Sequence, residues 1–286
     1  MRFDDYLGRV GQPSPHDASV DTLRRLHLAH RETFLFENLA IQTGGGISVA
    51  LPDLERKFID EGRGGYCFEH NTLFAAALGD AGFPTTTLLG RVRRGPPERW
   101  SRTHMVLRVP VGREVWLADV GFGSIGLIEP IPLRDGATAE QGGFTYRLRR
   151  DASLWILSVR DADGAETDLY EFSDDPQTAM DVEVANHYTS THPDSIFRKT
   201  LTIQRTARDR RTILRGEVLT RMGEGRMVDV PFPRERLREI AREEFAIELP
   251  SRPLVFETEG AIHGQYAVPG LSWTATTVGK KTDTTT

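Results

Sequence analysis

The stretch RGGYCFEHN, residues 63–71, contains the single cysteine of a 286-residue chain. Two glycines precede Cys67, and the residues after it show the apolar spacing of a helix. A helix N-terminus favours a thiolate because its unpaired N–H groups carry partial positive charge. Gly64 and Gly65 would allow a sharp turn and the close approach of a substrate. Cys67 is therefore either a small core residue or a nucleophile, and its position alone does not separate the two.

Helical periodicity dominates the chain around this stretch. Apolar residues recur at helical spacing within residues 19–40 and 51–60, and Ser19 or Asp21 can serve as the first N-cap. A third helix is predicted to begin at Tyr66 or Cys67 and to end near Gly79 or Gly82. Cys67 would then lie in the first turn of that helix.

After Pro84 the pattern changes to short runs rich in β-branched and aromatic residues. Six such runs cover residues 85–92, 103–109, 114–120, 144–150, 154–160 and 167–172. Their spacing indicates an antiparallel barrel or sandwich. Residues 175–200 are polar and are expected to be helical or irregular. Further strands are predicted at 199–206, 210–216, 217–222 and 226–230, followed by a helix within 233–247 and a disordered end at 280–286.

Composition excludes several classes of protein. Hydrophobic residues make up 38% and charged residues 27%, as in ordinary globular proteins. The net charge of −5 arises from 36 basic and 41 acidic residues that are well mixed, so no basic face for nucleic acid is expected. One cysteine excludes an intramolecular disulfide, and no apolar run reaches the length of a membrane span. We expect a reducing, cytoplasmic setting.

A partner base for the cysteine emerges from a predicted hairpin. A turn centred between Val111 and Gly112 places His104 directly opposite Asp119, with Cβ atoms about 5 Å apart. Such an Asp fixes the imidazole tautomer and stabilises the imidazolium that forms when a thiol gives up its proton. The alternative is an ordinary cross-strand polar pair, and a three-residue loop would put the two on opposite faces. The order Cys67, His104, Asp119 indicates cysteine-dependent acyl transfer.

Four short blocks then resemble the arylamine N-acetyltransferase family, in the family's order and at compatible separations. They are FENL at 36–39, RGGYCFEHN at 63–71, RTHMVL at 102–107 and DVGFG at 119–123, and HPDSIFRKTLTIQR at 192–205 resembles a later family segment. The resemblance implies an α+β, three-domain fold with a cysteine-protease-like triad. A helical bundle would occupy residues 1–83, an antiparallel β-barrel 84–188 and an α/β lid 189–275, leaving 276–286 as a disordered tail.

The same resemblance implies the chemistry. Acetyl-CoA would be the donor and an arylamine or arylhydrazine the acceptor in a ping-pong cycle, with a role in xenobiotic metabolism. Cys67 would be the acetylated nucleophile, His104 its base and Asp119 the orienting carboxylate, and no metal is implied. Further positions resemble family residues that approach the donor or line the acyl pocket: Thr103, Gly121, Phe122 and Gly123. Glu37 and Arg63 resemble a buried pair that supports the triad, whereas His70 stands where the family often has an apolar residue.

Other interpretations remain open from the sequence. The triad would also suit a macrolactam-forming amide synthase of the same family, or a hydrolase or transglutaminase-type enzyme. A binding module with a structural Cys67 is a rival of another class. GFGSIG at 121–126 matches a dinucleotide-binding pattern, but Pro130 and Pro132 stand where that site needs a helix.

Two further features have competing interpretations. Arginines at 91, 93, 94, 99 and 102 form either a solvated loop or a contact for CoA phosphates. Phe36, Tyr66 and Phe68 are either core residues or part of a slot for a flat acceptor. Phe122 is the aromatic residue expected on an exposed loop, because glycines flank it.

Overall fold

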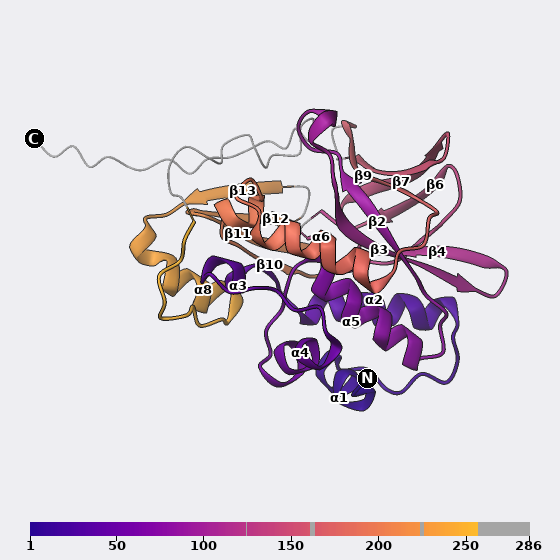
Figure 1. Cartoon of the computed structure of the whole chain (residues 1–286), viewed down its shortest axis with the longest axis horizontal. Coiled ribbons are helices and arrows are strands. Elements are labelled where there is room, and N and C mark those ends of the chain that lie inside the picture. Colours follow the sequence, from indigo (N-terminus) through magenta and orange to yellow (C-terminus); the bar gives the residue numbers. More distant parts are fainter. Residues whose placement is uncertain (124, 161–163, 224–225, 257–286) are drawn as a thin grey trace, which may run out of the picture.

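The computed structural model describes residues 1–256, except residues 124, 161–163 and 224–225; residues 257–286 are not described. N-terminal helices lie along one side of an eight-stranded sheet, and a five-stranded sheet stands beside both (Figure 1). The fold is α+β, as predicted. The tail predicted at 276–286 and the end of the predicted lid lie outside the described residues.

The N-terminal part is helical, as its periodicity predicts. Its elements are α1 (Phe3–Val10), α2 (Val20–Thr33), the short strand β1 (Phe36–Glu37), α3 (Leu39–Gln42), α4 (Leu51–Glu55), a π-helical turn η1 (Arg56–Asp60) and α5 (Cys67–Asp80). Ser19 caps α2, since its side chain accepts a hydrogen bond of 3.3 Å from the Thr22 N–H. Gly82, with a φ of 85°, follows the end of α5. The predicted starts of α2 and α5 are therefore confirmed.

The eight-stranded antiparallel sheet has the order β5-β4-β3-β2-β9-β8-β7-β6. Its strands are β2 (Thr86–Val92), β3 (Arg102–Val111), β4 (Glu114–Ala118), β5 (Ile131–Pro132), β6 (Ala137–Gln141), β7 (Phe144–Asp151), β8 (Leu154–Arg160) and β9 (Glu166–Ser173), with a 3-10 turn η2 (Pro97–Arg99) before β3. The edge strands β5 and β6 approach each other, so the barrel is nearly closed. Each of the six predicted runs contains a strand, although the run predicted at 114–120 ends as a strand at Ala118.

The C-terminal part begins with α6 (Ala179–Thr191) and α7 (Ile196–Lys199). Strands β10 (Thr202–Thr206), β11 (Arg210–Arg215), β12 (Val218–Gly223) and β13 (Arg226–Pro231) follow, then the turn η3 (Arg234–Arg236) and α8 (Leu237–Phe245). Strand β1 from the N-terminal part pairs with β10 and forms the edge of this sheet. The C-terminal sheet is thereby tied to the segment that leads into Cys67.

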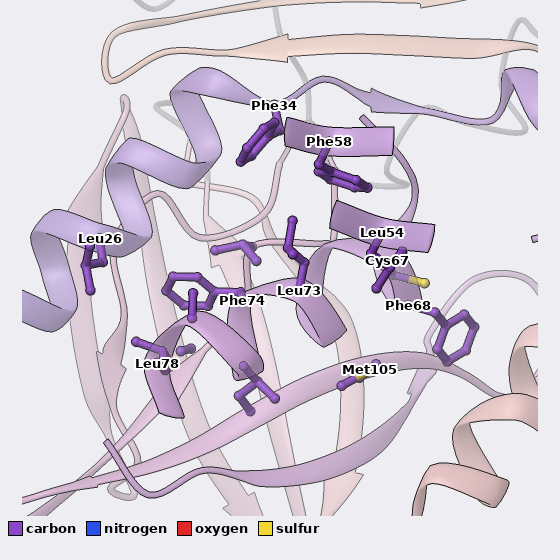
Figure 2. Close-up of a cluster of buried hydrophobic side chains, with 14 of the residues drawn as sticks. Leu26, Phe34, Leu54, Phe58, Cys67, Phe68, Leu73, Phe74, Leu78 and Met105 are labelled. Atoms are coloured by element: carbon purple, nitrogen blue, oxygen red, sulfur yellow. The ribbon is translucent and has the colours of Figure 1, made fainter. Parts of the chain in front are cut away.

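Three buried apolar clusters stabilise these parts. One lies between the N-terminal helices and strands β3 and β4, a second fills the barrel, and the third lies between the C-terminal sheet and α8. Cys67 stands at the edge of the first cluster, with its sulfur directed away from Leu73 and Phe74 (Figure 2). No helix among the described residues combines the length and apolar character that crossing a bilayer requires.

The hairpin of β3 and β4 has a different register from the predicted one. Val111 pairs with Glu114 and Leu107 with Ala118, so the two-residue turn is Gly112 and Arg113. The predicted centre, between Val111 and Gly112, is wrong by one residue. Because pairing then shifts by two residues, every side chain keeps its face of the sheet. Gly112 has a φ of 60°, a left-handed conformation that the two-residue hairpin turn requires and that glycine adopts without strain.

Candidate active site

Cys67 is the first residue of α5, and its side chain is 3% exposed. Its thiol donates to the carbonyl oxygen of Thr103 on β3, with a sulfur–oxygen distance of 3.6 Å. Burial raises the pKa of the Cys67 thiol, and the nearby charge of Asp119 raises it further. Hydrogen bonds from the backbone N–H groups of Phe68 and Met105 act in the opposite direction. The helix N-terminus alone therefore does not provide a stable thiolate.

His104 and Asp119 form the predicted contact in spite of the changed register. Nε2 of His104 lies 2.8 Å from Oδ2 of Asp119, and both side chains are buried. Strand β4 ends at Ala118, so Asp119 has left the regular ladder and its carboxylate reaches His104 diagonally. Asp119 has its pKa lowered by His104 and by hydrogen bonds, which outweigh the opposing effect of burial. It is therefore a charged carboxylate at neutral pH.

Asn71 joins this pair to the helix of the cysteine. It lies four residues after Cys67 on α5 and therefore shares its face of the helix. Its Nδ2 donates to Oδ1 of Asp119 at 3.1 Å and to the Met105 carbonyl at 2.7 Å, and its Oδ1 accepts the Val120 N–H at 3.1 Å. The sequence did not single out Asn71, although the four-residue spacing was a signal that could have found it.

Gly121 brings the loop after Asp119 against α5. A Cβ atom at this position would lie 2.8 Å from both the Cα and the carbonyl oxygen of Cys67, and 2.6 Å from Nδ2 of Asn71. The Gly121 N–H also donates to Oδ1 of Asp119 at 2.9 Å. The close approach that glycine allows here is to the helix of the cysteine, and not to a bound ligand. It brings the Cys67 backbone and the Asp119 carboxylate into the same small volume.

The rest of this loop has mixed exposure. Gly123 is buried, and a Cβ there would lie 2.9 Å from Oε1 of Gln204 on β10. Phe122 was predicted to be exposed but is half-buried; its ring centroid lies 5.1 Å from that of His104.

Arg31 of α2 holds this loop, since it donates to the carbonyl oxygens of Val120 at 3.2 Å and Gly123 at 2.8 Å. Sequence patterns gave no indication of Arg31.

The glycines before Cys67 also meet protein and not open space. A Cβ at Gly64 would lie 1.7 Å from the carbonyl oxygen of Leu35, and one at Gly65 would lie 2.4 Å from a carboxylate oxygen of Glu69. The expectation that these glycines admit a substrate is wrong. Gly64 instead lets the segment before α5 pack against Leu35, just after α2. Gly65 leaves room for the carboxylate of Glu69, which accepts a hydrogen bond from the Tyr66 N–H at 3.0 Å.

Buried Glu37 pairs with half-buried Arg63 near the start of α5. Glu37 is fully buried, and its Oε1 lies 2.6 Å from Nη2 of Arg63. Its other oxygen accepts the Leu39 N–H at 2.6 Å, and its own N–H donates to Gly65 at 2.8 Å. This pair fixes the segment that enters the cysteine helix.

Three histidines outside the predicted triad are buried: His27, His30 and His70. His70 does not face the cysteine; its Nδ1 lies 2.9 Å from Nε2 of His30, and its Nε2 lies 3.1 Å from the Leu35 carbonyl. Among the described residues, no group of three or more His, Cys, Asp or Glu side chains is arranged to hold a metal ion.

The remaining predicted features are the arginine run, three aromatic residues and the GFGSIG loop. Arg93 pairs with Asp168 at 2.9 Å and lies over the ring of Trp100, so it is not an open phosphate contact. Arg99 and Arg102 are exposed. Phe36, Tyr66 and Phe68 are all buried core residues. GFGSIG is followed by β5 and not by a helix, which excludes the dinucleotide-binding interpretation.

A buried thiol at a helix start contacts the strand that carries an imidazole bonded to a carboxylate. This arrangement is typical of proteins that use cysteine as a nucleophile. Comparison with known proteins identifies the family. The family model described as N-acetyltransferase matches residues 19–255. An arylamine N-acetyltransferase of Mycolicibacterium smegmatis is 36% identical over 227 residues, which are 77% of this chain and 82% of that protein. The chain belongs to the arylamine N-acetyltransferase family.

Solved structures agree with this assignment. The arylamine N-acetyltransferase of Nocardia farcinica is 36% identical, with a TM-score of 0.81 over 87% of this chain and 90% of that one. The Mycobacterium marinum enzyme, solved in complex with CoA, is 31% identical, with a TM-score of 0.80 over 86% of this chain and 92% of that one. The predicted family and fold are confirmed, and membership places the chain among the acyltransferases.

Proposed function

We propose that the chain transfers an acetyl group from acetyl-CoA to arylamines and arylhydrazines through an acetyl-Cys67 intermediate. The observation that carries this proposal is the buried 2.8 Å contact between His104 Nε2 and Asp119 Oδ2, in a site that also contains the Cys67 thiol. Family membership supports the reaction class, and the CoA complex of the M. marinum relative supports the donor.

The first half-reaction removes the thiol proton. Asp119 accepts a hydrogen bond from Nε2–H of His104, which leaves Nδ1 as the ring nitrogen able to accept the proton of Cys67. Burial opposes a free thiolate, so the proton moves to His104 as the sulfur attacks the thioester carbonyl. The carbon–sulfur bond to CoA then breaks, and the imidazolium returns a proton to the departing CoA thiolate.

The second half-reaction reverses these roles. A neutral amine or hydrazine attacks the acetyl carbonyl, His104 takes the proton that the nitrogen loses, and Cys67 leaves as the thiol after reprotonation. Backbone N–H groups at the start of α5, at Cys67 and Phe68, are suited to stabilise the oxyanion in both halves. Asp119 holds the imidazolium in each half without taking up the proton itself.

Donor contacts are assigned to the rim of the site. We place Thr103, Phe122 and Gly123 beside the thioester end of acetyl-CoA. The reason is that the Thr103 carbonyl accepts a hydrogen bond from the Cys67 thiol and the Phe122 ring packs against His104. Gly121 contributes through its packing on α5, which sets the path of this loop. The half-buried Phe122 also offers a flat apolar face to an aromatic acceptor.

Donor preference tests this function. The protein is expected to acetylate an arylamine or an arylhydrazine with free acetyl-CoA, and His104→Ala is expected to abolish turnover while circular dichroism shows a folded protein. Activity only with carrier-bound acyl chains would contradict the proposal and favour an amide synthase. Slow alkylation of Cys67 by iodoacetamide that does not change in His104→Ala would instead favour a structural cysteine.

A further inference from the structure

His27 connects α2 to both ends of the loop that follows β4. It is fully buried, and both ring nitrogens are engaged: Nδ1 lies 2.7 Å from the carbonyl oxygen of Ile128, and Nε2 lies 3.2 Å from the backbone nitrogen of Asp119. The ring packs edge-on against Phe74 of α5, with centroids 5.6 Å apart. A single imidazole therefore bridges residues 119 and 128.

The partners of His27 define its tautomer. A carbonyl oxygen only accepts, so Nδ1 carries the proton and donates to Ile128. Nε2 then has a lone pair and accepts the Asp119 N–H. Burial and the charge of Arg31 lower the pKa of His27 to about 4, against opposing effects of its two hydrogen bonds and of Asp119, so the ring is neutral at pH 7. His27 is a fixed one-donor, one-acceptor link.

The bond to Asp119 matters because of where β4 ends. Asp119 follows the last paired residue of β4, Ala118, so its N–H has left the strand ladder and is bonded to His27. Asn71 and the Gly121 N–H hold the carboxylate, whereas His27 holds the backbone from which that carboxylate projects. Without His27, a buried N–H and a buried carbonyl would lack partners, and the loop would shift to find others.

We propose that His27 is a positioning residue for the acetyl transfer: by clamping residues 119 and 128 it holds the Asp119 carboxylate in reach of His104. The inference rests on the proposed function, because its effect is transmitted through the reactivity of Cys67. It assigns no contact between His27 and either substrate.

The test compares variants at two buried histidines of the same helix. His27→Leu removes the donor and the acceptor, whereas His27→Gln keeps one of each. His30→Leu is the matched control: His30 is equally buried one turn further along α2, but it bonds to Tyr6 and His70 and not to Asp119. The readout is the rate of Cys67 alkylation by iodoacetamide as a function of pH, with thermal stability measured in parallel.

His27→Leu is expected to slow alkylation at pH 7 by about tenfold and to move the midpoint of the pH profile upward. A displaced Asp119 stabilises the imidazolium less, and this loss exceeds the relief of its direct repulsion of the thiolate. His27→Gln should restore most of the rate. His30→Leu should lose stability but keep the wild-type profile. If His27→Leu does not fold, His27→Asn supplies the test, since its shorter amide cannot reach both partners and should also slow alkylation.

Two outcomes would overturn the inference. One is a wild-type profile in His27→Leu or His27→Asn, and the other is an equal displacement in His30→Leu, which would make the effect a general consequence of lost stability. The proposed function is judged separately with His104→Ala. If that variant also keeps the wild-type profile, the proposed function fails; if it alone loses reactivity, only the role of His27 fails.

Discussion

Three buried neutral histidines make the stability of this protein depend on pH. Burial lowers the pKa of His27 to about 4 and that of His70 to about 3, and it lowers the pKa of His30 well below its usual range. The Leu35 carbonyl accepts a hydrogen bond from Nε2–H of His70, so Nδ1 of His70 must accept from Nε2–H of His30, and Nδ1 of His30 from Tyr6 O–H. A second proton on His30 or His70 would break this series of hydrogen bonds.

The direction in which stability changes with pH follows from proton binding. In the unfolded chain these histidines titrate near about 6.5, whereas the folded protein keeps them neutral until a much lower pH. The unfolded state therefore binds more protons below that value, and stability falls as the pH is lowered. Between pH 7.5 and 5.5 each histidine costs about 1.4 kcal/mol, so the three together cost about 4 kcal/mol.

Urea unfolding at the two pH values measures this cost. Glu69 acts in the opposite direction, because burial raises its pKa, so the comparison is made between two proteins that share it. His70→Leu is less stable at both pH values, but its loss between pH 7.5 and 5.5 should be smaller than that of the wild type by about 1.4 kcal/mol. An equal loss in the two proteins would refute the assignment of a buried neutral His70.

Three further changes test other contacts. Gly121→Ala should cost roughly 1–3 kcal/mol and nearly abolish acetyl transfer, because its Cβ would lie 2.8 Å from the Cys67 backbone; wild-type turnover at normal stability would contradict this packing. Glu37→Gln should cost roughly 1–3 kcal/mol in urea unfolding, since it removes the carboxylate charge that faces half-buried Arg63 and Lys57, and an unchanged midpoint would argue against the pair. Arg93→Glu should lower the melting temperature of the protein without raising the KM for acetyl-CoA, because Arg93 pairs with Asp168. A raised KM at normal stability would support the interpretation of Arg93 as a contact for CoA phosphates.

Local patterns predicted the elements well. The start of α5 was visible because the glycines, the apolar spacing and the following turn signals all agree within a short window. Strands β5 and β6 were not predicted. β5 is two residues long and ends in Pro132, and the inward positions of ATAEQ in β6 carry alanine, which is depleted in strands. The hairpin register was missed because a shift of one turn residue leaves the alternation of apolar and polar positions unchanged.

The contacts that build the site were harder to foresee. His104 could be matched to Asp119 because one hairpin joins them. His27 and Asn71 meet the Asp119 segment from 92 and 48 residues away in sequence, across separate helices, and no local pattern reports such contacts. The family resemblance implied the same three residues for the proposed triad, but it gave no indication of the side chains that hold Asp119.

The central claim is that Cys67 carries the acetyl group between donor and acceptor. Brief incubation with acetyl-CoA without an acceptor, followed by intact mass measurement and peptide mapping, tests it most directly. One acetyl group is expected on the peptide that contains Cys67, and it should disappear when an arylamine is added. Label on another residue, or no label in a protein that still acetylates arylamines, would contradict the covalent route.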